Sequence, residues 1–547
     1  MQFQTLLHIY LQHLPAHGKS PLSSVQVARE SAIGSTMLVV GDILSTAFTA
    51  IATVIVARLL GPEAYGLYAL VFVAPTIFMQ LFGLGVNVAI TRYVAFYLSK
   101  GEIDHAVQIT KRATMFLLLF GIVLSLANYY AAPYMAVVVL GRAALIPYIQ
   151  LTSIFIIAQA AQHASGYAFV GWNLIKELSI FSILQAVLRL AIGPALILIG
   201  FGMYGAVLGT IAPYVVQGAA ALLTLYVLKL RSSSKGVSSF VNDIKTLIGY
   251  GFQIFAGSLA FGCASQYLLI ILASVATNEI VGEYQAAVNL TISIFVISNG
   301  VTTVLIRSFS TLDGLRADLT QTFDYAVRYV SFLLTPVVVF LFSSAGLLFD
   351  VIYGQFYSEG VIFLQLTAIS YLPVAFGLTV LPSFLNGIGK SRFTMLLNIA
   401  GAASLVVAGI GLAVLSGLGG VGIVYAILVS NVITTVLGLF LSVRLIRSRL
   451  TLGPLLSIVA AALMGSIVMY YIPDNILPPT VLLLVDVIIF TFVYLSLVPL
   501  FRGVSLADVD RLALSTEEIH LLGRVIKVVL NYERWILRKS GAPSSRS

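Results

Sequence analysis

The chain contains two copies of one unit in tandem. Residues 85–92 read Gly-Val-Asn-Val-Ala-Ile-Thr-Arg, and residues 300–307 read Gly-Val-Thr-Thr-Val-Leu-Ile-Arg, at an offset of 215 residues. The same offset relates Gln-Leu-Thr-Ser-Ile at 150–154 to Gln-Leu-Thr-Ala-Ile at 365–369. Because both copies lie in apolar sequence, the duplication is typical of membrane transporters built from two related halves around a shared site.

The composition predicts a membrane protein. Of the 547 residues, 59% are hydrophobic and 9% are charged. Apolar runs of about 20 residues recur along the chain, each long enough to cross a hydrocarbon layer as a helix. The runs are continuous rather than alternating, which favours helices over a barrel. We predict an all-α polytopic fold with about fourteen spans, near 35–58, 66–90, 111–132, 147–170, 176–199, 204–229, 245–273, 283–307, 325–347, 361–386, 391–415, 420–443, 453–472 and 479–501.

Each copy of the repeat holds six of these spans. An even number inserts both copies with the same orientation, so we predict two parallel lobes and two extra helices. The Ser-rich stretch between spans six and seven has the composition of a flexible linker. The predicted segments are an N-terminal segment 1–32, an N-lobe 33–230, a linker 231–243, a C-lobe 244–449, helices thirteen and fourteen at 450–501, and a tail 502–547.

The distribution of basic residues predicts the orientation of the chain in the membrane. With both termini in the cytoplasm, only Arg58 and Arg142 face outward and Arg189 stays within a span. This asymmetry follows the positive-inside rule and predicts a multi-pass protein of the cell membrane. The net charge of +9 is then a topology signal, and its scatter over many loops argues against a nucleic-acid partner.

The sequence gives no sign of a metal or cofactor. The single cysteine, Cys263, lies inside a span and allows neither an internal disulfide nor a cysteine cluster. His8, His13 and His17 are irregularly spaced, which is typical of solvated side chains. The N-terminal segment lacks the pattern of a cleaved signal, so the first span is expected to serve as an uncleaved insertion signal.

Polar residues form stripes along four predicted spans. Spans one and two are the repeat partners of spans seven and eight, so one polar cavity between the lobes explains all four stripes. The alternative is that small polar residues only hold neighbouring helices together. The candidate cavity residues on these stripes are Asp42, Thr46 and Thr49 in span one, Gln80 and Asn87 in span two, Gln253 in span seven, and Gln285 and Asn289 in span eight.

Charged residues refine this expectation. Asp42 is expected roughly 10 Å from the cytoplasmic edge, where a carboxylate pairs with a cation or takes up a proton. Arg189 lies roughly 20 Å along its helix, and its guanidinium suits a phosphate or carboxylate. The alternative for Arg189 is a structural ion pair with an acid such as Asp42. Arg92 and Arg307 end equivalent spans, as topology anchors or as two cations at the cytoplasmic mouth, and Asp486 receives no role.

The tail predicts an amphipathic helix. Ser515 and Glu518 form a capping box, and apolar residues follow at helical spacing with basic residues on other faces. Such a helix is expected to lie on the cytoplasmic leaflet, and docking of a partner is the alternative.

The segment 57–68, Ala-Arg-Leu-Leu-Gly-Pro-Glu-Ala-Tyr-Gly-Leu-Tyr, carries a family resemblance. It resembles the hallmark of the polysaccharide-transporter branch of the multidrug/oligosaccharidyl-lipid/polysaccharide flippase superfamily, with an echo at Gly282-Glu283-Tyr284. The resemblance implies a flippase that moves a glycan on a polyprenyl phosphate or pyrophosphate to the outer leaflet, for surface polysaccharide or glycoprotein glycan assembly. It also implies a cavity lined by spans one, two, seven and eight.

We expect alternating access, in which Arg92, Arg189 and Arg307 stabilise the phosphate while hydroxyls and amides replace water around the sugars. The expected partners are a lipid-linked oligosaccharide, membrane lipids and glycan-assembly enzymes. One alternative is a cation-coupled multidrug or small-molecule exporter of the same superfamily. Another is a membrane glycosyltransferase or polymerase, but the predicted outer loops are short and offer no evident catalytic residues, so we expect no enzyme. A passive structural protein would leave the stripes unexplained.

Overall fold

The computed structural model describes residues 24–231, 239–311, 316–446, 450–472, 477–506, 508–509 and 523–539. These residues form helices joined by short turns. The helices that matter here are α2 (Ser24–Val71), α3 (Val73–Gln80), η1 (Phe82–Gly85), α4 (Val86–Ser99), α5 (Ile103–Tyr134), α6 (Ile146–Gly171), α7 (Ile175–Leu196), α8 (Gly202–Leu225), α9 (Phe240–Val275), α10 (Asn278–Leu290), α11 (Ile292–Thr311), α12 (Arg316–Ser343), α13 (Ala345–Ile352), α14 (Gly360–Ser370), α15 (Val380–Gly387), α16 (Ser391–Gly409), α17 (Gly419–Ile446), α18 (Leu452–Tyr470), α19 (Pro479–Leu500) and α21 (Gly523–Lys539).

Twelve helical stretches are long and apolar enough to cross a membrane. Two of them, Val40–Ser99 and Ile175–Leu230, contain 60 and 56 residues, whereas about 20 helical residues suffice for one crossing. Each is interrupted by a glycine with positive φ, Gly61 at 74° and Gly200 at 106°, a backbone conformation that favours glycine. The prediction of an all-helical polytopic membrane protein is confirmed, and twelve stretches compare with the fourteen spans predicted.

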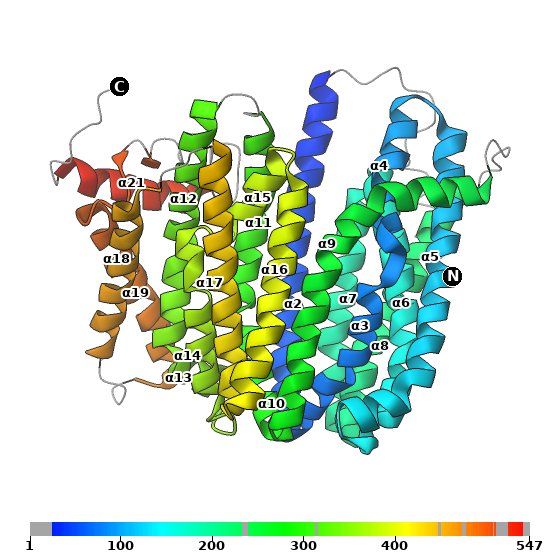
Figure 1. Cartoon of the computed structure of the whole chain (residues 1–547), viewed down its shortest axis with the longest axis horizontal. Helices are drawn as coiled ribbons and strands as arrows, with labels where there is room; N and C mark the ends of the chain where they lie inside the picture. Colours follow the sequence, from blue (N-terminus) through cyan, green and yellow to red (C-terminus); the bar gives the residue numbers. More distant parts are fainter. Residues whose placement is uncertain are drawn as a thin grey trace, which may run out of the picture.

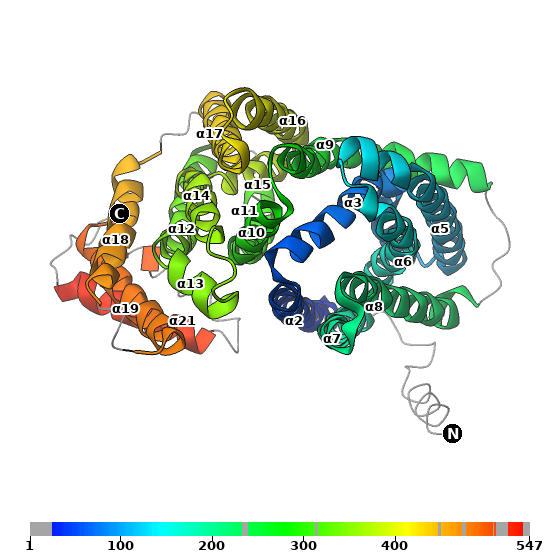
Figure 2. The ribbon, with the colours of Figure 1, turned by 90° about the horizontal axis from the view of Figure 1, so that it is seen from below.

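The helices run side by side between two ends of the molecule (Figure 1). We call the end that carries α21 the tail end, and the end that carries α10 and α13 the crossing end. Seen along the helices, α2–α8 form a first bundle and α10–α17 a second, with α18, α19 and α21 beyond the second (Figure 2). Helix α9 lies between the bundles, because it packs against η1 and α4 on one side and against α16 on the other.

The predicted segment boundaries remain predictions, but helices run past two of them. Helix α2 begins at Ser24, inside the N-terminal segment 1–32. Helix α9 begins at Phe240, inside the predicted linker 231–243, of which residues 232–238 lie outside the described part of the chain.

The two bundles meet where α2 crosses α10. A Cβ atom on Gly66 would overlap the carbonyl oxygen of Asn278, and one on Gly282 would overlap the carbonyl oxygen of Pro62. Gly66 and Gly282 also face each other, and they are 216 residues apart, within one residue of the sequence repeat, so equivalent positions of the two copies meet here. Only glycine lets two helix backbones approach this closely. We call this contact the glycine crossing.

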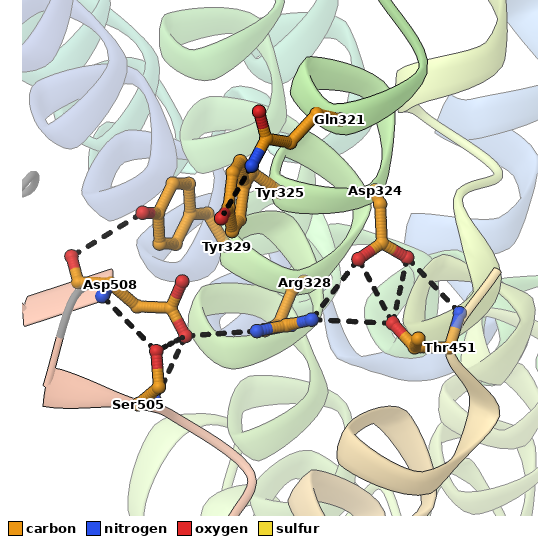
Figure 3. A network of polar contacts seen from close by, with 8 residues as sticks. All are labelled: Gln321, Asp324, Tyr325, Arg328, Tyr329, Thr451, Ser505 and Asp508. Atoms are coloured by element: carbon orange, nitrogen blue, oxygen red, sulfur yellow. Dashed lines mark hydrogen bonds and ion pairs between the residues drawn. The ribbon is translucent and has the colours of Figure 1, made fainter. Parts of the chain in front are cut away.

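The extra helices are attached to the second bundle at the tail end. Arg328 of α12 contacts Asp508, beyond α19, at 2.9 Å and Asp324 at 3.0 Å. Asp324 also accepts hydrogen bonds from the backbone and side chain of Thr451, which precedes α18 (Figure 3). Ser505 donates to the same oxygen of Asp508 that Arg328 contacts. Arg328 therefore attaches the segments next to α18 and α19 to the second bundle.

The tail helix α21 docks on α19. The hydroxyl groups of Tyr532 and Ser496 lie 2.8 Å apart, and Leu530 is buried while Trp535 remains 57% exposed. The predicted amphipathic helix is thus present over 523–539, although its capping box lies outside the described residues. Its buried face contacts the protein's own helices and also contains Glu533, which is fully buried and has no hydrogen-bond partner among the described residues.

The glycine crossing predicts an overpacking effect. Gly282→Ala places a methyl group against the backbone of α2 and should cost about 1–3 kcal/mol of stability. The apparent Tm in detergent should fall accordingly. Gly249→Ala is the matched control, since a Cβ atom at this position in α9 meets no atom within 4 Å. Equal Tm values for both variants would show that the bundles do not depend on this contact.

Glu533 predicts that docking of α21 weakens as pH rises. Burial raises the pKa of this carboxyl group from 4.5 to about 8. Between these values an undocked tail releases a proton that the docked tail keeps, so rising pH favours undocking. In a Trp172→Phe background Trp535 is the sole tryptophan, and its quenching by acrylamide should increase between pH 4.5 and about 8. Glu533→Gln should remove this increase, and an unchanged pH response in that variant would contradict the assignment.

Candidate functional site between the bundles

Arg189 lies on α7, deep within the first bundle. The register of α7 against α2 is fixed by two contacts, because Gly41 packs on Ser179 and Gly193 faces Val56. Arg189 therefore lies near the middle of the paired helices. Its guanidinium group is hydrogen-bonded to Tyr68 and lies beside Tyr214 and Tyr65.

Tyr65 connects these residues to the second bundle. Its side chain is 2% exposed, and its hydroxyl oxygen accepts a hydrogen bond of 2.6 Å from the amide of Asn289 on α10. Gln285 in turn donates to the Asn289 carbonyl oxygen at 3.3 Å. Asn289, a predicted cavity residue, therefore contacts a tyrosine of the other bundle, and Gln285 contacts Asn289. We call Arg189, Tyr65, Tyr68, Tyr214 and Asn289 the arginine–tyrosine cluster.

The cluster contains a cation and no carboxylate. Among the described residues no ion pair includes Arg189, and its neighbours are phenol groups. The alternative ion pair with Asp42 does not form, since Asp42 lies at the level of Ser179, ten residues or roughly 15 Å before Arg189. A charge within a membrane span is costly unless it faces water or an oppositely charged group. The cluster can therefore bind an anion through charge-assisted hydrogen bonds.

The polar stripe of α2 lies closer to the tail end. Asp42 is exposed, and Thr46 and Thr49 are half-buried. Apolar neighbours of Asp42, among them Ile43 and Leu44, are exposed as well, because this half of α2 packs mainly on α7. In the part of the chain that the structure describes, no basic side chain pairs with Asp42.

The stripe of span two packs partly on α9. The amide of Gln80 lies directly against Gly262 of α9, so Gln80 joins two helices, as the alternative interpretation of the stripes expects. Asn87 is half-buried on α4, beside Gly83.

Arg92 occupies the tail-end face of α4. It is exposed and stacks on the ring of Tyr250 in α9, with 4.1 Å between the guanidinium carbon and the ring centroid. This cation–π contact leaves its charge accessible. Its repeat partner Arg307 lies in α11, and Gln253 lies in α9, but both side chains are outside the described part of the structure.

Side chains close the crossing end. Arg58 donates to the backbone oxygen of Val351 at 2.9 Å, and Tyr357 donates to that of Ala57 at 2.7 Å. Arg142 donates to the backbone oxygen of Ala273 at 2.9 Å. Burial raises the pKa of Tyr357, which keeps its phenol protonated as a donor. Arg58 and Arg142, the two arginines predicted to face outward, thus contact α13 and α9 respectively at this end of the molecule.

Sequence reasoning missed the tyrosines of the cluster. Tyr65 and Tyr68 are part of the segment 57–68, but that segment served only to identify a family. The available signal was their spacing of three, which places both on one helix face. In the described residues, no group of three His, Cys, Asp or Glu side chains gathers as metal ligands.

Comparison with known proteins assigns the chain to a family. Residues 55–362 match the family model described as "Polysaccharide biosynthesis protein". The chain is similar to the stage V sporulation protein B of Bacillus subtilis (strain 168), with 26% identity over 449 residues that cover 73% of this chain and 83% of the relative.

Solved structures share the fold. The lipid II flippase MurJ in an inward closed conformation aligns with a TM-score of 0.70 and 14% identity, over 85% of this chain and 98% of that one. An inward-facing multidrug resistance transporter of the MATE family, in the MOP superfamily, aligns with a TM-score of 0.63 and 17% identity, over 74% and 94%. The resemblance found at residues 57–68 is confirmed, and the chain belongs to the polysaccharide biosynthesis protein family and shares the fold of these two solved structures.

Proposed function

We propose that the protein is a flippase of the cell membrane. It moves an oligosaccharide linked to a polyprenyl phosphate or pyrophosphate from the cytoplasmic to the outer leaflet, for assembly of a surface polysaccharide or glycoprotein glycan. The proposal fits membership of the polysaccharide biosynthesis family and a fold shared with a lipid II flippase. It goes beyond both, because neither identifies the substrate of this chain.

The arginine–tyrosine cluster carries the proposal. Arg189 offers a permanent positive charge inside a membrane bundle, with phenol hydroxyls beside it and no carboxylate among the described residues to neutralise it. A phosphate group matches the fork of donors on a guanidinium. Hydroxyls and the amide of Asn289 suit the adjoining sugar, because they donate and accept hydrogen bonds as water does. A neutral drug or a cationic drug would gain little from this charge.

We infer that the chain crosses the membrane fourteen times. The stretches Val40–Ser99 and Ile175–Leu230 then each cross twice, turning at Gly61 and Gly200. This gives two parallel lobes of six spans and two added helices. The tail end is cytoplasmic under the positive-inside rule, so the crossing end faces outward.

Alternating access then follows from the bonds at the crossing end. Arg58, Arg142 and Tyr357 hold that end closed, so the headgroup enters from the cytoplasm and its phosphate reaches Arg189. Arg92, exposed at the tail end, attracts the anion first. Separation of α2 from α10 at the glycine crossing would open the crossing end to the outside. The lipid tail stays in the bilayer throughout.

Substitution of Arg189 tests the proposal. Cells without the protein should accumulate a lipid-linked oligosaccharide on the cytoplasmic leaflet, and the wild-type gene should clear it. Arg189→Gln should reduce transport of that lipid into proteoliposomes about 10- to 100-fold, the loss of one charge-assisted contact to phosphate. Its Tm should not fall, since the variant removes a half-buried charge within a membrane bundle that no described carboxylate neutralises.

Arg444→Gln is the control for this experiment. Arg444 is exposed near the end of α17, and its loss removes one positive charge at the tail end without touching the cluster. Transport by this variant should match the wild type. Equal transport by both variants, or a deletion strain that accumulates no lipid-linked glycan, would reject the proposed function.

A second candidate, a cation-coupled exporter, rests on Asp42. This exposed carboxylate has no basic partner among the described residues, and it lies within a span. A proton or sodium ion that neutralises it would lower the cost of burying it when the bundles move. The same ion could drive export of a small molecule or movement of the glycolipid.

Asp42→Asn separates coupling from substrate choice. We expect a proton or sodium gradient across proteoliposomes to stimulate transport by the wild type and to leave the variant unaffected, because asparagine binds neither ion as a carboxylate does. If both proteins respond alike, Asp42 has no part in coupling. Efflux of a drug without any movement of lipid-linked glycan would favour the exporter over the flippase.

A further inference from the structure

A second polar cavity lies at the crossing end, between the second bundle and the added helices. Its volume is about 910 Å³, within the range of roughly 300–1,000 Å³ that small-molecule sites occupy. Helices α12, α13 and α14 form one wall, and α18 and α19 form the other (Figure 2). The polar lining consists of Ser343, Ser344, Asp350, Gln355, Tyr357, Ser358, Gln365, Ser466, Tyr470 and Asp486.

Buried polar groups mark this cavity as a binding site. Asp486 of α19 is 7% exposed, although it lies in the most apolar of the candidate spans. An ionisable residue in such a span is retained for a function more often than for stability. Ser344 is 3% exposed, and its hydroxyl group has no hydrogen-bond partner among the described residues. Both side chains line the cavity, so a ligand there would meet a carboxylate and a hydroxyl already withdrawn from solvent.

The chemistry of the lining selects the ligand. Two carboxylates, several hydroxyls and two carboxamides line the cavity, and no lysine, arginine or histidine is among the described residues of the lining. Tyr470, which is 87% exposed, adds an aromatic ring on which the apolar face of a sugar can pack. We propose that this cavity binds a sugar without acidic groups, neutral or carrying an amino group, as a second subsite at the crossing end.

Other ligands fit less well. A phosphate or an acidic sugar would be repelled by the carboxylates of Asp350 and Asp486, and the described lining offers it no basic side chain. A single metal ion is held by oxygen ligands at about 2.0–2.6 Å. A cavity of about 910 Å³ is larger than such a site requires. A polyhydroxylated ligand, in contrast, can use carboxylate, hydroxyl and amide groups together.

The choice of a sugar rests on the proposed function, but the cavity is separate from the arginine–tyrosine cluster. The two sites share no described residue, since the described lining of the cavity lies between residues 342 and 486. Tyr357 of the cavity wall connects them, because it donates its hydrogen bond to Ala57 of α2. The added helices are attached at the tail end through Arg328, and at the crossing end they form one wall of the cavity.

Sugar binding to the full-length protein in lipid nanodiscs tests the inference. Maltoside detergents are avoided, because their headgroup is itself a sugar. The probes are a disaccharide of glucosamine, a disaccharide of N-acetylglucosamine, and glucuronic acid, titrated by saturation-transfer NMR. The first two should bind and glucuronic acid should bind at least about tenfold more weakly. The double variant Asp350→Asn, Asp486→Asn should weaken the glucosamine disaccharide about tenfold or more, as loss of charge-assisted hydrogen bonds does.

Two further variants locate the binding. Ser466→Phe, which fills the cavity from α18, should abolish binding of both disaccharides, and its Tm reports that the protein is still folded. Arg189→Gln should bind both disaccharides as the wild type does, so the inference and the proposed function can fail separately. The inference is overturned if the wild type binds neither disaccharide, if Ser466→Phe binds them normally, or if the two aspartates affect only the binding of sodium or calcium.

Discussion

The close approach of α2 and α10 at Gly66 and Gly282 is the contact on which the rest of the site depends. Tyr65 precedes Gly66 by one residue, and Asn289 follows Gly282 by two helical turns, so the same contact that joins the backbones sets the 2.6 Å hydrogen bond between these side chains. Tyr68, one turn beyond Tyr65, reaches Arg189 on α7. Gly66 and Gly282 thus determine where the guanidinium group of Arg189 meets the second bundle.

The sequence predicts much of this arrangement. The repeat at 215 residues indicates two copies of one unit, and the glycine crossing pairs positions 216 residues apart. The polar stripe of span eight includes Gln285 and Asn289, and the structure places Asn289 beside Tyr65 with Gln285 bonded to it. Apolar run length identified the spans, because it depends on composition alone. The sequence does not show which residues of different helices face each other, since that depends on the rotation and axial shift of each pair of helices.

Other contacts depend on the same alignment of helices. The alternative ion pair between Asp42 and Arg189 requires both to lie at one depth, but α2 and α7 are aligned so that Asp42 lies beside Ser179. The stripe of span two was predicted to line a cavity, and its residue Gln80 packs on Gly262 of a neighbouring helix. The tail helix was predicted from its apolar and basic positions, which do not reveal that Glu533 is buried. In each case the contact depends on a neighbouring element that the sequence does not identify.

The distribution of charge links the two polar sites. Arg328 pairs with Asp324 and Asp508 where the added helices are attached (Figure 3). The two polar sites differ in the charge that they offer. Arg189 lies among tyrosines, whereas Asp350 and Asp486 line a cavity whose described lining includes no basic residue. Under the proposed function, this difference suits a ligand with an anionic group at one position and uncharged or amino sugars at another, as in the headgroup of a lipid-linked glycan.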